Sequence, residues 1–157
     1  MSNLKIRRAD ERDISVLLIL AEEFMSEVEA SREKRMKILR KALRNPDYEL
    51  VVAELDGEIV GFIDQWIIHD FAHGARLSYI QNLYITSKHR SKGIGSKLLD
   101  EIIRSAENKG VLEIHVVTEF ENKPAINLYR KHGFVEESLQ LEREFDQIDS
   151  AVTERNH

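Results

Sequence analysis

The 157-residue sequence predicts a single α/β (α+β) domain spanning residues 1–157, with a mixed, mostly antiparallel sheet of about seven strands flanked by four helices. Three observations indicate this class. Segments of helical and strand periodicity follow one another in the order β-α-α-β-β-β-α-β-α-β-β. A strand–helix–strand unit over residues 77–118 predicts one parallel strand pair. Asp56-Gly57, between two strand-like runs, is typical of a tight antiparallel hairpin.

The N-terminal part of the chain predicts one strand and two helices. Leu4 to Arg7 alternates in polarity as a short strand does. Asp10 can cap a helix that runs to Phe24, because its side chain can accept a hydrogen bond from the first turn. Ser31 to Leu43 shows apolar residues at helical spacing, and Pro46 bars any continuation of that helix.

The middle of the chain is rich in strand-forming residues. We expect strands over Tyr48 to Leu55, Glu58 to Ile68 and Leu77 to Thr86, because each run is dense in β-branched and aromatic residues. His69 to Arg76 is expected to be a loop. These three strands supply the antiparallel part of the predicted sheet.

The C-terminal part alternates between helix and strand. Apolar residues recur with helical period over residues 95–109, and Val111 to Thr118 has the pattern of a buried strand. Asn122 can cap a further helix, which ends at His132-Gly133. Phe134 to Phe145 predicts a last strand pair, and the polar tail after residue 145 is expected to fray.

Composition excludes several classes of function. The net charge of −5 argues against a nucleic-acid-binding surface, which usually needs a basic face. The absence of cysteine excludes disulfides, thiolate metal ligands and a cysteine nucleophile, and it agrees with a cytoplasmic location. The longest apolar run, Ile14 to Ala21, is too short to cross a membrane, so no membrane partner is expected.

A basic stretch with two glycines, HRSKGIGSKLL, occupies residues 89–99 between a predicted strand and a predicted helix. The first N–H groups of a helix have no intrahelical partner, and the helix dipole adds positive charge there. Glycines allow close approach of a ligand to the backbone, and Arg90 and Lys92 add full charges. The stretch therefore predicts a bound phosphate or pyrophosphate. A glycine-containing turn with solvated basic residues is the alternative.

Two familiar phosphate-binding motifs do not fit this stretch. The P-loop requires a glycine five residues before Gly95, and none stands there. The dinucleotide fingerprint requires a third glycine where this chain has Leu98. An ATPase or an NAD-dependent enzyme is therefore disfavoured.

Three segments carry a resemblance to a known family. Arg90 to Ser96 forms an R-x-x-G-x-G loop that resembles the acyl-CoA-binding loop of the GNAT superfamily of N-acyltransferases. Asn122 to Phe134 matches the N-x-x-A-x-x-L-Y-x-x-x-G-F segment of that family at every fixed position. Asn82 to Ile85 is similar to its N-L-x-V strand, with isoleucine in place of valine.

The resemblance implies where acetyl-CoA would bind. In the family the loop amides hold the pyrophosphate, and a strand backbone pairs with the pantetheine arm in a slot where two parallel strands splay apart. Here these strands are 77–86 and 111–118. For Asn122 a role as helix cap alone is an equal alternative. The residues so implicated in acetyl-CoA binding are Leu83, Tyr84, Ile85, Arg90, Ser91, Lys92, Gly93, Ile94, Gly95, Ser96, Asn122 and Tyr129.

Tyr129 matches the general acid of the family. When an amine attacks the thioester, CoA thiolate leaves, and a phenol can donate a proton or a hydrogen bond to the sulfur while staying neutral at pH 7. A backbone N–H near Tyr84 or Ile85 could polarise the thioester carbonyl. A packed tyrosine on a helix face is the alternative interpretation of Tyr129.

The general base is left open by the sequence. Many relatives carry a glutamate where this chain has Gln81, and a carboxamide cannot accept the proton. Gln81 could instead position the amine or a water molecule. The remaining candidates are His69, His73, His115 and Glu119. His69 and His73 have H-x-x-x-H spacing, but their loop setting argues against a metal site, so no metal is expected.

The sequence thus predicts an N-acetyltransferase that moves an acetyl group from acetyl-CoA to a primary amine by direct attack in a ternary complex. A non-catalytic module that binds or senses acyl-CoA is the alternative, and a plain nucleotide-phosphate binder is a third hypothesis. The resemblance also implies a homodimer through the final strands. It implies an acceptor pocket formed by the first two helices, the loop at residues 69–76 and the last strands.

Overall fold

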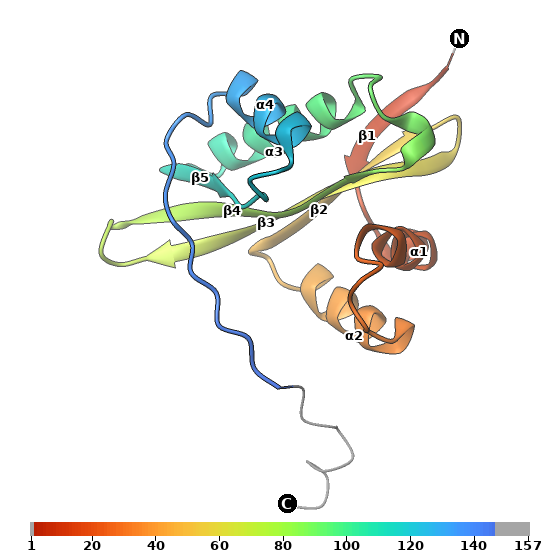
Figure 1. Cartoon of the computed structure of the whole chain (residues 1–157), viewed down its shortest axis with the longest axis horizontal. Coiled ribbons are helices and arrows are strands. Elements are labelled where there is room, and N and C mark those ends of the chain that lie inside the picture. The colour runs from red at the N-terminus through yellow and green to blue at the C-terminus, as the bar shows by residue number, and fades with distance from the viewer. Residues whose placement is uncertain (1, 147–157) are drawn as a thin grey trace, which may run out of the picture.

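The computed structural model describes residues 2–146. These form one five-stranded sheet in the order β1-β2-β3-β4-β5, with α1 and α2 on one face and α3 and α4 on the other (Figure 1). The elements are β1 (Leu4–Arg8), η1 (Glu11–Asp13), α1 (Ile14–Phe24), α2 (Arg32–Leu43), β2 (Tyr48–Leu55), β3 (Glu58–Asp70), β4 (Ala75–Ile85), η2 (Ser87–His89), α3 (Ile94–Asn108), β5 (Glu113–Val116) and α4 (Lys123–Lys131).

The sheet is mixed, as the sequence predicts. Strands β1 to β4 pair antiparallel, and β4 pairs with β5 in parallel. The β4–α3–β5 crossover gives the parallel pair because the helix returns the chain to the same end of the sheet. At the β2–β3 hairpin, Asp56 and Gly57 have φ of 50° and 86°, the two positive values that a tight hairpin turn requires.

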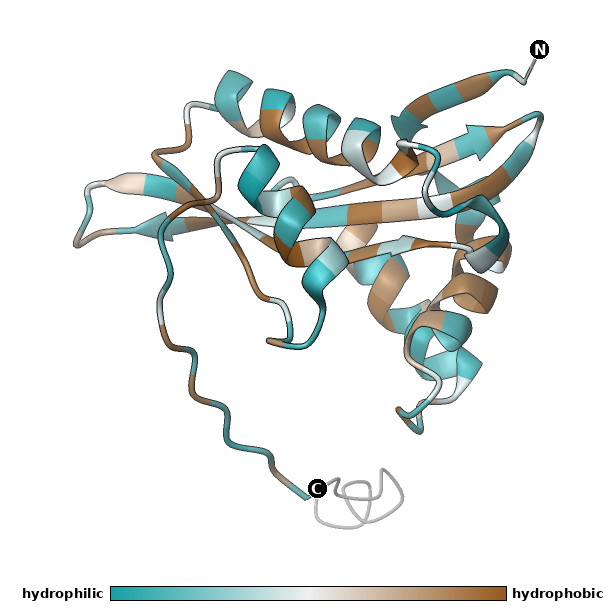
Figure 2. Ribbon diagram, turned by 45° about the horizontal axis from the view of Figure 1, so that its top comes forward, coloured by the Kyte–Doolittle hydropathy of each residue, from teal (hydrophilic) through white to brown (hydrophobic). Residues whose placement is uncertain are grey.

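Two hydrophobic cores lie on opposite faces of the sheet. Val51, Ile63 and Ile80 pack with the buried face of α3 on one side. Val52 and Phe62 pack with Leu17 and its neighbours on α1 on the other side. Successive strand residues therefore alternate between the two cores, as the strand period of two dictates. Figure 2 colours the ribbon by hydropathy and shows hydrophobic residues along the strands between the two helix layers.

The predicted sheet of about seven strands is wrong, because residues 134–145 form no strand in the described chain. This segment leaves α4 as an extended coil, and its apolar side chains Val135, Leu139, Leu141 and Phe145 are all exposed. Alternating apolar residues predict strand geometry locally, but a strand pair needs a sheet or a packed face beside it to be stable. The predicted fraying of the tail largely concerns residues 147–157, which lie outside the described residues.

The predicted loop at residues 69–76 is a shorter turn than expected. Asp70 pairs with Ala75 at the end of the β3–β4 ladder, so only residues 71–74 make the connection. The Asp70 carboxylate accepts a 3.0 Å hydrogen bond from the Ala72 N–H and stabilises this turn. Polar side chains here produced a loop signal, but backbone pairing in an exposed hairpin does not require apolar side chains.

Candidate active site

Strand β4 has an edge that β5 covers only in part. The parallel register runs from Leu77 opposite Glu113 to Ile80 opposite Val116, and β4 then continues to Ile85. Strand β5 spans four residues, shorter than the predicted strand over residues 111–118. Within the described chain, the edge of β4 from Gln81 onward thus has no β5 partner. A β4 edge without a β5 partner is what the expected splay of the two strands requires.

Gln81 lies at an irregularity in β4. In the β3–β4 register Asp64 is opposite Asn82 and Gln65 is opposite Ile80, so Gln81 is the extra residue of a β-bulge. The bulge coincides with the point where β5 ends. Gln81 therefore has no partner in the β3–β4 register, and it directly follows Ile80, the last β4 residue that pairs with β5.

The glycine loop places backbone amides at the start of α3. Gly93 is the N-cap of α3 with φ of 79°, and the first intrahelical bond runs from the Lys97 N–H to the Gly93 carbonyl at 3.2 Å. The N–H groups of residues 94–96 therefore precede the helical ladder and have no intrahelical acceptor. A Cβ added at Gly93 would meet no other atom within 4 Å, so positive φ rather than crowding explains the glycine. This arrangement fits a bound pyrophosphate.

Two loop side chains have structural partners. The Arg90 Nε donates a 2.9 Å hydrogen bond to the Ile85 carbonyl, and its guanidinium lies 5.6 Å from the ring centroid of Tyr84. The Ser96 hydroxyl is 3.1 Å from Nε2 of His132, which links α3 to α4. Arg90 thus ties the loop to the end of β4. For Ser96, the main-chain N–H is the group that suits the expected role.

The side chains of the β4 residues implicated in cofactor binding are part of the two cores. Leu83 and Ile85 pack against the core under α3. Tyr84 faces α1, where its ring lies 5.2 Å from that of Phe24 and its hydroxyl donates a 3.1 Å hydrogen bond to Glu23. The backbone of these residues, rather than their side chains, is therefore the part that can meet a pantetheine arm.

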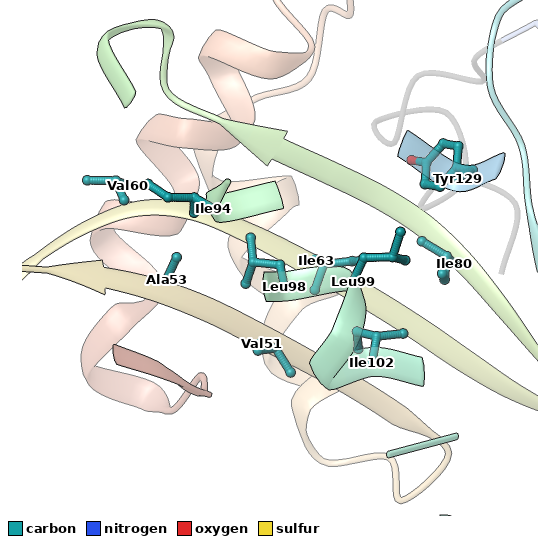
Figure 3. Close-up of a cluster of buried hydrophobic side chains, with 10 residues drawn as sticks. All are labelled: Val51, Ala53, Val60, Ile63, Ile80, Ile94, Leu98, Leu99, Ile102 and Tyr129. Atoms are coloured by element: carbon teal, nitrogen blue, oxygen red, sulfur yellow. The ribbon is translucent and has the colours of Figure 1, made fainter. Parts of the chain in front are cut away.

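Tyr129 is in the core under α3 and α4. Its side chain is 7% exposed, and its ring meets Phe134 edge-on with 5.8 Å between the ring centroids. Burial raises the pKa of Tyr129 to about 12. The phenol is therefore neutral over the whole physiological range and keeps its proton. Figure 3 shows that Tyr129 stands at one edge of the cluster, near Ile80 of β4.

Asn122 caps α4, and its side-chain oxygen accepts a 3.3 Å hydrogen bond from the Ala125 N–H. The cap role is therefore confirmed, whereas contact with CoA stays a prediction. In this position the side-chain nitrogen of Asn122 is the group that could still donate to a ligand.

The other candidate bases lie apart from Gln81. His69 Nε2 is 3.5 Å from Asp47, and His73 Nδ1 is 2.7 Å from Asp70 in the β3–β4 turn. His115 stacks on Tyr79 with ring centroids 4.8 Å apart, and its Nε2 is 2.9 Å from Glu113. Glu119 is exposed beyond the end of β5. The structure does not bring any of these four residues to the pocket that Gln81 lines.

Gln81 lines a cavity of about 370 Å³ between the sheet and the helices α1 and α2. Its lining also includes Phe24, Phe62, Trp66 and Asp64. Neither the β3–β4 turn nor residues 134–145 line this cavity, so of the three parts expected for the acceptor pocket only the two helices line it. The volume lies in the range typical of small-molecule sites.

Asp64 is the site residue that sequence reasoning missed. It is 5% exposed and accepts a 2.6 Å hydrogen bond from the Tyr48 hydroxyl. Its Oδ1 also accepts from the Asn82 N–H at 2.8 Å, and the Asn82 side-chain nitrogen is 3.0 Å from Oδ2. Burial raises the pKa of Asp64, and these hydrogen bonds oppose the shift. The available signal was a lone carboxylate inside the apolar run GFIDQWI.

No helix within residues 2–146 has the length and apolar character needed to cross a membrane. Over the same residues, no group of three or more histidine, aspartate or glutamate side chains is arranged to hold a metal ion.

Comparison with known proteins gives consistent matches along the chain. Residues 15–134 match the sequence model of the acetyltransferase (GNAT) family. The chain is 29% identical over 147 residues to the thialysine N-epsilon-acetyltransferase of Mus musculus, covering 85% of each protein. It is 32% identical over 101 residues to an N-alpha-acetyltransferase of Sulfurisphaera tokodaii, covering 60% of each. The fold is similar to that of aminoglycoside N-acetyltransferase AAC(6')-Iy in complex with CoA, with a TM-score of 0.81, 21% identity, and 92% and 96% of the two chains covered.

Proposed function

The chain belongs to the acetyltransferase (GNAT) family and transfers an acetyl group from acetyl-CoA to an amine, and we propose that it does so by direct attack in a ternary complex. The observation that carries this mechanism is one arrangement around β4. The amides at the start of α3, the uncovered β4 edge and the acceptor-sized cavity that contains Gln81 meet along this strand. The sequence has no cysteine to form a thioester acyl-enzyme, which supports direct attack of the amine on acetyl-CoA. A non-catalytic acyl-CoA sensor is not favoured, because the named relatives are acetyltransferases.

For acetyl-CoA, the N–H groups of residues 94–96 would hold the pyrophosphate at the positive end of the α3 dipole. Lys92 is exposed beside them and adds charge. The backbone of Leu83 to Ile85 would then pair with the pantetheine arm along the uncovered edge of β4. In this assignment Arg90 supports the loop through the Ile85 carbonyl, and its contact with phosphate is secondary.

Tyr129 is assigned as the group that meets the leaving sulfur. The neutral amine attacks the thioester carbon, an oxyanion forms, and the C–S bond then breaks to release thiolate. Free thiols have a pKa of about 8.5, well below the value of about 12 for Tyr129. Tyr129 therefore acts first as a hydrogen-bond donor to the developing thiolate. Starting from the ammonium form, the nitrogen loses two protons. The CoA thiolate takes up one and solvent takes up the other, which leaves an N–H amide and CoA thiol.

Gln81 is assigned a positioning role. Its carboxamide can accept a hydrogen bond from the amine, but it cannot take up a proton. Its place in the β-bulge at the end of the β4–β5 pairing sets it between the cavity and the uncovered strand edge. It would therefore orient the amine toward the thioester.

Two broader expectations remain part of this proposal. A homodimer is supported by the exposed apolar side chains of Leu139, Leu141 and Phe145, which a second copy could cover. Figure 2 shows the segment after α4 running away from the sheet with hydrophobic residues along it. A cytoplasmic location stays a prediction from the cysteine-free sequence. Sedimentation analysis of the full chain tests the dimer, and a monomer at all concentrations would contradict it.

The direct test of the proposed function measures thiol release from acetyl-CoA with a panel of primary amines and amino acids. We expect amine-dependent release of CoA and a single acetylated product by mass spectrometry. Binding of CoA in calorimetry, combined with no turnover of any amine in a broad panel, would contradict the enzyme assignment.

A further inference from the structure

The acceptor cavity has an unusual distribution of charge. Aromatic and aliphatic side chains make up most of its wall, including Phe24 of α1, Ile38 of α2 and Trp66 of β3. Within the described chain its lining includes one carboxylate, Asp64, and one basic side chain, Arg35. A ligand in this cavity would lose part of its water, so a charge that it places against the apolar wall needs a partner on the protein.

Asp64 is placed to bind one positive charge. On β3, Phe62, Asp64 and Trp66 are each two residues apart, so their side chains lie on the same face of the strand, toward the cavity. A carboxylate has about four acceptor positions. The Tyr48 hydroxyl, the Asn82 main-chain N–H and the Asn82 side-chain nitrogen donate to Asp64, and the Gln81 main-chain N–H adds a further hydrogen bond. These donors hold the carboxylate in one orientation, and an ammonium group that binds it would share one of its oxygens with them.

Arg35 makes a second positive charge on the ligand unfavourable. Its guanidinium lies 3.4 to 3.5 Å from the carbonyl oxygens of Met25, Val28 and Ala30, in the connection between α1 and α2. Carbonyl groups do not cancel its charge. Among residues 2–146, Glu22 interacts with Arg35 electrostatically, but its carboxylate pairs directly with Arg32. A ligand with a second ammonium group would meet this cation and the apolar wall.

The charged and titratable groups that face Asp64 in the cavity can be named for each element. Strand β2 contributes Tyr48 and helix α2 contributes Arg35. Helix α1 contributes only apolar lining residues, and β4 contributes the uncharged Gln81 and Asn82. Burial raises the pKa of Asp64 and its hydrogen-bond donors oppose that shift. An ammonium group beside the carboxylate would favour the ionised form further.

We infer that the acceptor is a primary amine with an apolar body, whose single amino nitrogen binds as ammonium beside Asp64 and loses a proton to solvent before it attacks. This inference rests on the proposed acetyl transfer and specifies its substrate class. The body would lie against Phe24, Phe62 and Trp66, and the nitrogen would lie beside Asp64 and Gln81. We therefore expect polyamines and aminoglycosides, which carry several positive charges, to be poor substrates.

The test compares three amines of equal chain length: hexylamine, 1,6-diaminohexane and 6-aminohexanoate. We expect kcat/KM for hexylamine to exceed that for 1,6-diaminohexane by at least tenfold, with 6-aminohexanoate also above the diamine. Equal or better use of the diamine would overturn the inference. Equally low kcat/KM for 1,6-diaminohexane and 6-aminohexanoate would overturn it too. That result would mean that the polarity of the far end of the substrate, rather than its positive charge, determines selectivity.

Variants of the protein supply a second, independent arm. Asp64→Asn should raise KM for hexylamine at least tenfold while leaving the Kd for CoA unchanged. Asp70→Asn makes the same change on the same strand outside the cavity and should alter neither. An unchanged KM in Asp64→Asn would overturn the inference. Arg35→Met should reduce the ratio of kcat/KM for hexylamine to kcat/KM for 1,6-diaminohexane. This variant tests the charge argument even if Asp64→Asn does not fold.

The outcomes also separate this inference from the proposed function. If polyamines or aminoglycosides are acetylated while hexylamine is not, only the substrate class is wrong. If acetyl-CoA binds and no amine of any class is acetylated, both the inference and the proposed function are wrong.

Discussion

The Tyr48 hydroxyl donates a 2.6 Å hydrogen bond to Oδ2 of Asp64 at the wall of the acceptor cavity. The two residues come from neighbouring strands, β2 and β3, and both line the cavity. Burial raises the pKa of Asp64, and the hydrogen bond from Tyr48 acts in the opposite direction by stabilising the ionised form. The ionisation of Asp64 therefore depends on the Tyr48 hydroxyl. Replacing Tyr48 with phenylalanine removes this hydroxyl and keeps the aromatic ring in the cavity wall.

Replacing Tyr48 with phenylalanine should shift the pH dependence of amine use. Loss of the hydrogen bond raises the pKa of Asp64 further, so the carboxylate becomes protonated at a higher pH. Amine binding needs the ionised form, and the acidic limb of the kcat/KM profile should therefore move to higher pH. Steady-state kinetics from pH 5 to pH 9 measure this. A shift to lower pH, or the same shift in Asp64→Asn, would contradict the link.

Replacing Tyr129 with phenylalanine should lower kcat by roughly 10² or more, within the range for loss of a general acid. CoA affinity should change little, because the ring and its contact with Phe134 remain. Thiol-release kinetics and calorimetry measure the two quantities. Tyr79→Phe is a matched control, since it removes the hydroxyl of a β4 tyrosine that stacks on His115. Equal turnover of Tyr129→Phe and wild type would remove Tyr129 from the mechanism.

The alkaline side of the pH profile provides a separate test of Tyr129. Its pKa of about 12 means that the phenol keeps its proton up to about pH 11. We therefore expect kcat to show no loss from tyrosine ionisation between pH 8 and pH 10. A fall in kcat near pH 9 that disappears in Tyr129→Phe would show that the tyrosine ionises earlier than burial implies.

Replacing Gly93 with alanine should weaken CoA binding about fivefold to tenfold. The residue has φ of 79°, and an L-residue in this region costs about 1–2 kcal/mol, which would displace the amides at the start of α3. Gly74→Ala is the control, because Gly74 has φ of 62° and open surroundings in the β3–β4 turn. Both variants should lose some stability in thermal melts. Only Gly93→Ala should lose CoA affinity in calorimetry.

Glu49 should make the protein sensitive to acid. Burial alone would raise the pKa of Glu49, but hydrogen bonds from Lys109, Ser105 and Arg8 outweigh it and lower the pKa below 4.5. A carboxylate with a lowered pKa stabilises the fold fully above about pH 4.5, and this stability is lost as the pH falls through the folded-state pKa. Urea unfolding against pH measures this dependence. Glu49→Gln should lower the free energy of unfolding by about 3 kcal/mol at pH 7. The free energy of unfolding of this variant should also depend less on pH in the acidic range.

The sequence by itself determined the order of the elements, the parallel β4–β5 pair and the loop at the start of α3. These depend on short-range signals: residue periodicity, helix caps such as Asn122, and a glycine at position 93, where the backbone needs a positive φ. The same local reasoning failed for residues 134–145, because a strand exists only where another strand or a packed face is available to it. It also extended the connection between β3 and β4 beyond its true length.

Only the tertiary structure decided which polar groups share the acceptor cavity. Asp64 and Asn82 are distant in sequence, and strand pairing brings them opposite each other. The one-residue bulge at Gln81 shifts the β4 register and so sets which β4 residues face each side of the sheet. The sequence shows that a carboxylate is present in an apolar strand, but its face, its hydrogen-bond donors and the helices that cover it depend on strand register and layer packing. These are long-range properties, since each depends on contacts between segments that no local pattern encodes.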